Sequence, residues 1–180
     1  MKLIPTGIED FKTIIDRDTY YIDKTELVSD VLKEQVVTYT RPRRFGKTLN
    51  MSMLYYFFSN KEKENAYLFD GLKISQNNEA MKYQNKYPTI FITLKDMKNS
   101  TFDKQINRYR EVLSFCAKNY LELLESPYLL KSEKELFQKY VDGTVEDNKL
   151  ESSLLNLSYF LNKHYHQKVI LLIDEYDVPL

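Results

Sequence analysis

Apolar residues along the chain alternate between short β-branched runs and longer stretches with helical spacing. The run VVTYT, residues 36–40, predicts a buried strand, and TIFITL, residues 89–94, predicts a second. Residues 169–173 form a continuous apolar run, which is typical of a central parallel strand. Because helical patterns separate these runs, the sequence predicts an α/β fold with a mainly parallel sheet flanked by helices.

Helical periodicity supplies the other elements of this prediction. After an irregular lead-in and a polar, mixed segment at residues 60–88, apolar residues three and four positions apart predict helices over 24–34, the stretch KTLNMSMLYYFFS, 101–124, 132–141 and 146–165. Asp23 and Glu26 have the spacing of a capping box for the first helix. The helical residues at about 101–165 are too many for a simple crossover. We therefore expect them to form a helical insertion before the last strand.

Composition narrows the class of protein. The chain has 180 residues, 43% of them hydrophobic, which is enough for a core. Its 26 basic and 26 acidic residues balance, which argues against a general attraction to nucleic acid or anionic membranes. One cysteine, Cys116, excludes an internal disulfide framework and fits a reducing compartment. The N-terminus does not resemble a signal peptide, and no apolar run reaches the ~18 residues of a spanning helix, so we expect a cytoplasmic protein without membrane partners.

A candidate phosphate-binding loop lies between the first predicted strand and the helix after it. Gly46, Lys47 and Thr48 match the end of the pattern G-x-x-x-x-G-K-[ST], but Arg41 stands where its first glycine belongs. Pro42, with its fixed φ, can set the turn that this glycine would have allowed. In such a loop the backbone amides face phosphate, the lysine spans the β- and γ-phosphates, and the hydroxyl ligates Mg²⁺. A chance GKT match is the alternative.

A second candidate motif follows the last predicted strand, where the apolar run ends in Asp174 and Glu175. In P-loop NTPases a strand beside the loop ends in an aspartate that holds the Mg²⁺ shell. An adjacent glutamate is well placed to orient and deprotonate the attacking water. Many strands end in polar residues, yet both motifs here follow predicted strands at carboxyl ends, where α/β sheets bind ligands. The ordered pair therefore favours nucleotide binding.

The segments IPTGIEDF, YYIDKTELV, TRPRRFGKTLNMSML and VILLIDEYDVP closely resemble the predicted AAA-ATPase-like family of bacterial and archaeal proteins. The resemblance extends from Leu3 to Pro179, and the RPRRFGKT loop is its most specific element. An arginine-rich loop is the usual form in that family, so Arg41 fits it. The resemblance implies a P-loop NTPase-like sheet with Walker A and Walker B motifs. Full-length members commonly carry a PD-(D/E)XK nuclease-like domain further along.

Carried over residue by residue, the resemblance implies ATP and Mg²⁺ as ligands. Lys47 would contact the β- and γ-phosphates and, with Glu175 as general base, act in catalysis. Thr48 and Asp174 would hold the metal. The implied nucleotide-binding residues are Arg43, Arg44, Phe45, Gly46, Lys47, Thr48 and Leu49. For Arg41, Arg43 and Arg44, phosphate contact, pairing with acids such as Asp177, and contacts with protein or nucleic acid stay open.

The end of the chain adds a further expectation. Leu180 comes five residues after Glu175, whereas this class of ATPase normally has a further strand after the acidic motif. We expect residues 1–180 to be the N-terminal part of an AAA-ATPase-like domain, without a second domain and with a sheet core incomplete at the C-terminus. Weak or absent ATP turnover by the chain alone would follow. An exposed edge at residues 169–173 would favour self-association.

Other functions compete with an ATPase. In one alternative the protein is a non-catalytic interaction module: the helical residues 101–165 bind a partner protein, and the GKT loop has only a structural role. In another, the arginines at 41–44 contact nucleic acid, although the zero net charge of the chain disfavours this. His164 and His166 have no acid or cysteine nearby to complete a metal site, so a surface turn is the better interpretation. Cys116 lies on an apolar helix face and is expected in the core rather than as a nucleophile.

Overall fold

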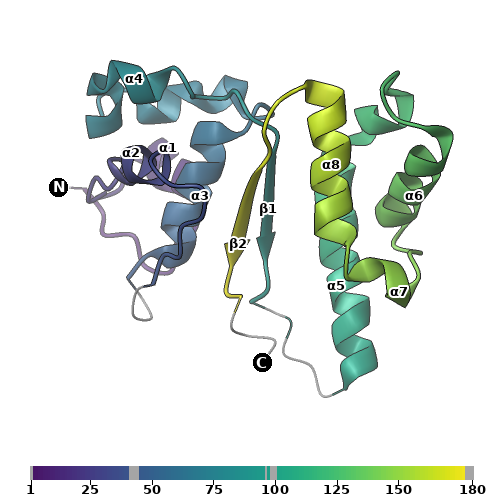
Figure 1. Ribbon diagram of the computed structural model, residues 1–180. Coiled ribbons are helices and arrows are strands. Elements are labelled where there is room, and N and C mark those ends of the chain that lie inside the picture. The colour runs from purple at the N-terminus through teal and green to yellow at the C-terminus, as the bar shows by residue number, and fades with distance from the viewer. Residues whose placement is uncertain (1, 41–44, 96, 98–100, 177–180) are drawn as a thin grey trace. The chain divides into compact units, whose positions relative to one another are not determined.

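The computed structural model describes residues 2–40, 45–95, 97 and 101–176 (Figure 1). These residues fall into two compact units, Met1–Thr89 and Ile90–Leu180. The elements, in which η marks a 3₁₀ helix, are α1 (Phe11–Asp16), α2 (Leu27–Val31), α3 (Lys47–Phe58), η1 (Lys63–Phe69), η2 (Lys73–Gln76), α4 (Asn78–Met81), β1 (Thr89–Thr93), α5 (Phe102–Lys118), η3 (Leu121–Glu125), α6 (Lys131–Asp142), α7 (Asp147–Leu150), α8 (Ser153–Tyr165) and β2 (Ile170–Asp174).

The first unit is built around α3, the helix predicted to follow the phosphate loop. Its apolar side chains Met53 and Phe57 are fully buried, because α1 and η1 pack against this helix. The Phe69 ring of η1 lies 5.1 Å from Phe57 and 5.2 Å from Phe11 of α1, measured between ring centroids. Aromatic rings at this spacing contribute large buried area and favourable edge contacts. The stretch 60–88, which carries no clear helical pattern, thus supplies a central part of this core.

The second unit combines a two-stranded sheet with a group of helices. β1 and β2 run side by side in the same direction, and the Leu94 amide donates to the Asp174 carbonyl over 2.9 Å at their ends (Figure 1). Helices α5, α6 and α8 form the core next to this pair. Its buried side chains include Ile90, Leu113, Phe137, Tyr140 and Leu157. The α/β class and the parallel pairing are therefore confirmed, while a larger P-loop NTPase-like sheet stays a prediction.

Helices in the second unit follow the predicted ones with changed ends. The predicted 101–124 helix ends at Lys118, and η3 follows after a turn at residues 119–120, ahead of Pro127. The predicted 132–141 helix corresponds to α6, which ends at Asp142 because Gly143 after it adopts a left-handed φ of +68°, a conformation that suits glycine. The predicted 146–165 helix is divided into α7 and α8 at residues 151–152. In the described part of the chain, no helix is both long and apolar enough to cross a bilayer.

The prediction of a buried strand at residues 36–40 is wrong. None of these residues belongs to a strand, and the Val36 side chain is 86% exposed. β-Branched residues favour a strand only where a paired, half-buried surface is available. Among the described residues, the two-stranded sheet consists of β1 and β2, and this run pairs with neither of them. β2 itself is only partly covered, since Leu171 is 41% exposed, and it is not the fully buried central strand that the sequence predicts.

The helix predicted over 24–34 is shorter in the structure, where it corresponds to α2, and the predicted capping box is wrong. Asp23 does not cap α2, because one carboxylate oxygen accepts hydrogen bonds from the amide and hydroxyl of Thr25, at 2.9 and 2.7 Å. Its other oxygen accepts from the Lys73 amide, 2.7 Å away. Glu26 turns to the Lys73 ammonium at 3.0 Å rather than back to a cap. Asp23 thus accepts from the first amide of η2, and the Thr25 hydroxyl accepts from the second, that of Ile74, at 3.1 Å.

Candidate functional site

Gly46 sets the geometry of the candidate phosphate site. It precedes α3 as its N-cap with φ +74° and ψ +31°, a left-handed conformation that other residues adopt only with strain. A Cβ atom built there would meet nothing within 4 Å, so backbone conformation rather than crowding selects glycine. The Gly46 carbonyl accepts from the Asn50 amide at 2.9 Å, the first hydrogen bond of the helix. The turn into α3 is therefore tight and well defined.

The first turn of α3 presents Lys47, Thr48 and Leu49, all partly buried. The amides of a first helical turn have no partner within the helix, and the helix dipole adds positive potential there. No acidic side chain stands in this turn to compete with an incoming anion. Within the described chain, neither the Lys47 ammonium nor the Thr48 hydroxyl engages in a hydrogen bond or ion pair. This arrangement suits a phosphate group.

Of the implied nucleotide-binding residues before Gly46, the structure describes Phe45 but not the two arginines. Phe45 lies directly before Gly46 and is 58% exposed. Arg43 and Arg44, together with Arg41, lie outside the described residues, as does Asp177.

A hydrogen bond closes the base of the loop. The Asn50 side-chain amide, which is buried, donates to the Tyr39 hydroxyl at 2.9 Å, and Tyr39 lies just before the loop residues. This contact joins the chain before the loop to the helix after it. Sequence reasoning missed it, although a buried polar residue at the start of an apolar helix face is a signal that a specific partner exists.

A second set of contacts holds α3 one turn further along. The Asp10 carboxylate accepts hydrogen bonds from the Ser52 and Tyr56 hydroxyls at 3.2 and 3.0 Å, and from the Thr13 amide at 2.8 Å. Burial acts to raise the pKa of Asp10, but the bonds from Thr13, Tyr56 and Ser52 outweigh it and lower that pKa. Burial and the Asp10 charge raise the pKa of Tyr56. The carboxylate is thus held ionised between α1 and α3.

The acidic motif has an unusual local structure at the end of β2. Asp174 is only 3% exposed, and its Oδ2 atom has no hydrogen-bond partner among the described residues. A buried, unpaired carboxylate oxygen is unfavourable, and an oxygen-seeking cation or its water shell would satisfy it. Glu175 follows with φ +55°, a conformation that costs a residue other than glycine about 1–3 kcal/mol. Such strain is found preferentially at functional sites.

The described site residues thus form two groups. The structure brings Gly46, Lys47 and Thr48 together at the first turn of α3, within the first unit. It brings Asp174 and Glu175 together at the end of β2, within the second unit.

Comparison with known proteins decides which family the chain belongs to. The family model described as "Predicted AAA-ATPase" matches residues 5–180, nearly the whole chain. The chain is a member of the predicted AAA-ATPase family. Its RPRRFGKT and LIDEYD segments fall inside the matched region.

Relatives of this AAA-ATPase family member give less detail. A protein from Azotobacter chroococcum mcd 1, described as an uncharacterized protein in the vnfD 5′ region, is 31% identical over 94 residues. The alignment covers 51% of this chain and 17% of that much longer protein. No solved structure matches the chain.

Two further candidates from the sequence have ordinary structural environments. Cys116 is buried in the core of the second unit, and burial raises the pKa of its thiol to about 12. A thiol with so high a pKa is a poor nucleophile, as the sequence predicts. His164 lies 2.9 Å from the Ser126 hydroxyl through Nδ1, and the His166 ring contacts Tyr128, with 4.4 Å between ring centroids.

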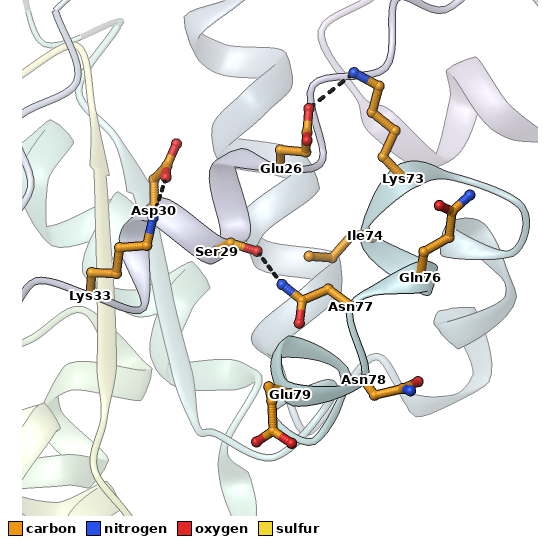
Figure 2. A pocket seen from close by; sticks show the side chains of 10 residues that line it. All are labelled: Glu26, Ser29, Asp30, Lys33, Lys73, Ile74, Gln76, Asn77, Asn78 and Glu79. Carbon is orange, nitrogen blue, oxygen red and sulfur yellow. Dashed lines mark hydrogen bonds and ion pairs between the residues drawn. The ribbon is translucent and has the colours of Figure 1, made fainter.

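A groove that the sequence does not predict lies between α2 and the η2–α4 segment (Figure 2). It has a volume of about 530 Å³. Ser29 of α2 accepts a 3.0 Å hydrogen bond from the Asn77 side chain across it, and Glu26 pairs with Lys73. Asp30 pairs with Lys33 along one wall. The third acid of the lining, Glu79, pairs with Lys82 outside the groove, so each of these three acids has a lysine partner.

Proposed function

We propose that this chain binds ATP with Mg²⁺ and that the first turn of α3 holds the phosphates. The observation that carries the proposal is the left-handed Gly46 leading into a helix whose first turn offers a lysine, a threonine and amides without a partner among the described residues. Helix N-termini of this kind bind phosphate through their amides and dipole. Membership of the predicted AAA-ATPase family supports the choice of a nucleotide as the ligand.

The proposal assigns each residue a role in binding. The Lys47 ammonium would contact the β- and γ-phosphate oxygens, whose negative charge complements its own positive charge. The backbone amides of Lys47, Thr48 and Leu49 would donate to the same phosphates. Of the remaining residues, Phe45 is exposed beside the turn and available to contact the nucleotide.

The donor atoms of the metal role also fit Mg²⁺. The Thr48 hydroxyl and the unpaired Asp174 carboxylate oxygen are hard oxygen ligands, the type that Mg²⁺ prefers. When bound, the ion would neutralise part of the phosphate charge. Asp174 would hold its water shell through the oxygen that has no hydrogen-bond partner among the described residues.

Hydrolysis is the reaction that the acidic motif suits. Glu175 would accept a proton from water as the water oxygen bonds to the γ-phosphorus, and the bond to the β,γ-bridging oxygen would break to give ADP and phosphate. The strained backbone at Glu175 supports a functional role for this residue. A Glu175→Gln variant should keep nucleotide affinity and lose any ATP turnover that the wild-type chain shows.

Binding of the fluorescent analogue mant-ATP with Mg²⁺ tests the proposal. Lys47→Ala should raise its Kd by about 10- to 100-fold, because charge-assisted hydrogen bonds are worth about 1.5–3 kcal/mol. Lys63→Ala, which removes an exposed lysine of η1, is the matched control and should leave the Kd unchanged. Equal affinities of wild type and Lys47→Ala would contradict the proposal and favour a protein-interaction module instead.

A further inference from the structure

The two oxygens of the Asp10 carboxylate serve different helices. Oδ2 accepts from the Thr13 amide and hydroxyl at 2.8 and 2.7 Å, which is the usual cap of a helix N-terminus. Oδ1 accepts from Ser52 and Tyr56, both on α3. Since a cap needs only one oxygen, the α3 contacts are an additional function of this side chain.

The α3 contacts of Asp10 lie close to the phosphate turn along the helix. Ser52 and Tyr56 are four residues apart, so they project from the same face. Ser52 also accepts from the Phe11 amide at 3.0 Å, which fixes the start of α1 against α3. Ser52 follows Thr48 by four residues, a distance of ~6 Å along a helix axis. We call the hydrogen bonds from Ser52 and Tyr56 to Asp10 the Asp10 clamp. The clamp therefore holds the turn of α3 that directly follows the one bearing Lys47 and Thr48.

We infer that Asp10 is a positioning residue for the nucleotide: through Ser52 and Tyr56 it holds α3 so that the phosphate turn is ordered before ATP arrives. This inference rests on the proposed function. Asp10 itself contacts neither phosphate nor metal in this account. Its effect passes through the backbone of α3 to the amides of the first turn.

Pre-ordering has a measurable consequence for affinity. A ligand that must order a loop or helix turn loses part of its binding free energy to that ordering. With the clamp intact, the amides already point in the binding direction. Without it, α3 still forms, because Phe57 and Met53 remain buried, but its first turns are less tightly held.

Two tyrosine variants separate this effect from a loss of stability. Tyr56→Phe removes one hydroxyl that donates to Asp10 and leaves the cap on α1 in place. Tyr67→Phe is the matched control, because the Tyr67 hydroxyl also donates to an α1 aspartate, Asp16, at 2.7 Å. That bond ties α1 to η1 and does not touch α3. Both variants lose one tyrosine–aspartate hydrogen bond beside α1, and Tyr67→Phe also loses the bond that the Tyr67 hydroxyl accepts from Lys12 at 2.6 Å.

A third variant divides the two functions of Asp10 itself. Asp10→Ser keeps a good N-cap residue, since serine caps helices about as well as aspartate. Its shorter side chain cannot also reach Ser52 and Tyr56. Thermal unfolding of each variant without nucleotide gives the stability against which affinities are compared.

The experiment measures the Kd of mant-ATP with Mg²⁺ for the full chain and the three variants. Tyr56→Phe and Asp10→Ser should each raise the Kd by about fivefold, part of the value of a hydrogen bond to a charged group, while Tyr67→Phe stays within about twofold of wild type. Equal Kd values for Tyr56→Phe and Tyr67→Phe would overturn the positioning role and leave ATP binding standing. Absence of binding by the wild-type chain would instead overturn the proposed function, and the positioning role with it.

Discussion

The phosphate turn and the acidic motif reach their conformations in opposite ways. The phosphate turn is held by the residues around it: Gly46 adopts its left-handed φ without strain, and Asn50, Ser52 and Tyr56, further along α3, each bond a partner outside the helix. At the end of β2, Asp174 has an oxygen without a partner among the described residues, and Glu175 adopts a left-handed φ that suits glycine better.

This difference teaches which part of the chain is built for stability. Supported contacts hold a binding turn in place whether or not its ligand is present. Unsatisfied and strained groups are unfavourable until something pairs with them, and they are retained where function needs them. We therefore expect substitutions around α3 to destabilise the protein, and some substitutions at the acidic motif to stabilise it.

Removing a buried aromatic ring near the end of α3 should have the largest effect. Phe57→Ala deletes a fully buried ring that packs on Phe69, and such changes reduce the free energy of unfolding by about 3–5 kcal/mol. Chemical denaturation of the variant measures it. Leu155→Ala, at a largely exposed position on α8, should change the same quantity by less than about 0.5 kcal/mol. A loss as large as that of Phe57→Ala at the exposed site would contradict the described packing.

A pair of glycine exchanges should give effects of opposite sign. Gly46→Ala forces a left-handed φ on a residue with a Cβ and should destabilise the protein by about 1 kcal/mol. Glu175→Gly relieves the same strain and should stabilise it, offset in part by the greater chain entropy of glycine in the unfolded state. Denaturation midpoints of the two variants give the signs. Destabilisation by Glu175→Gly would show that the acidic motif is not strained.

The pH dependence of stability should report the Asp10 clamp and is the smallest of the expected effects. The pKa of Asp10 is lowered in the folded protein from its ordinary value of 3.8 by hydrogen bonds from Thr13, Tyr56 and Ser52, which outweigh the opposing effect of burial. A depressed carboxyl pKa contributes stability that is present above the ordinary pKa and is lost as the pH falls through the folded value. Asp10→Ser should therefore flatten the stability profile below pH ~4 relative to wild type. Parallel profiles for the two proteins would argue against a clamp held by an ionised carboxylate.

Sequence patterns predicted the features that depend on residues close together in the chain, namely helices, the buried face of a helix and a turn. The helix Lys47–Phe58, the helix predicted over 132–141 and the burial of Cys116 all follow from the local spacing of apolar residues, and the structure confirms them. The turn at Gly46–Thr48 is equally local, because a glycine directly before an apolar helical pattern is enough to locate it.

The sequence patterns could not predict contacts between residues that lie far apart in the chain. The run at residues 36–40 has the composition of a strand, but pairing depends on a partner elsewhere in the chain, and the described residues supply none. Asp23 has the spacing of a cap, yet its carboxylate bonds Lys73, which is 50 positions away in the sequence. Asp10 could be recognised from its spacing to Thr13 as a cap of α1, but nothing local indicates its bonds to α3.

Hydrogen exchange at the first turn of α3 tests the central claim most directly. The amides of Lys47, Thr48 and Leu49 precede the first amide that bonds within the helix, that of Asn50, so they should exchange rapidly in the free protein. Saturating Mg²⁺ and ATP should slow their exchange strongly and leave the amides of α6, in the other unit, unchanged. If the three amides exchange at the same rate with and without nucleotide, this turn does not bind phosphate.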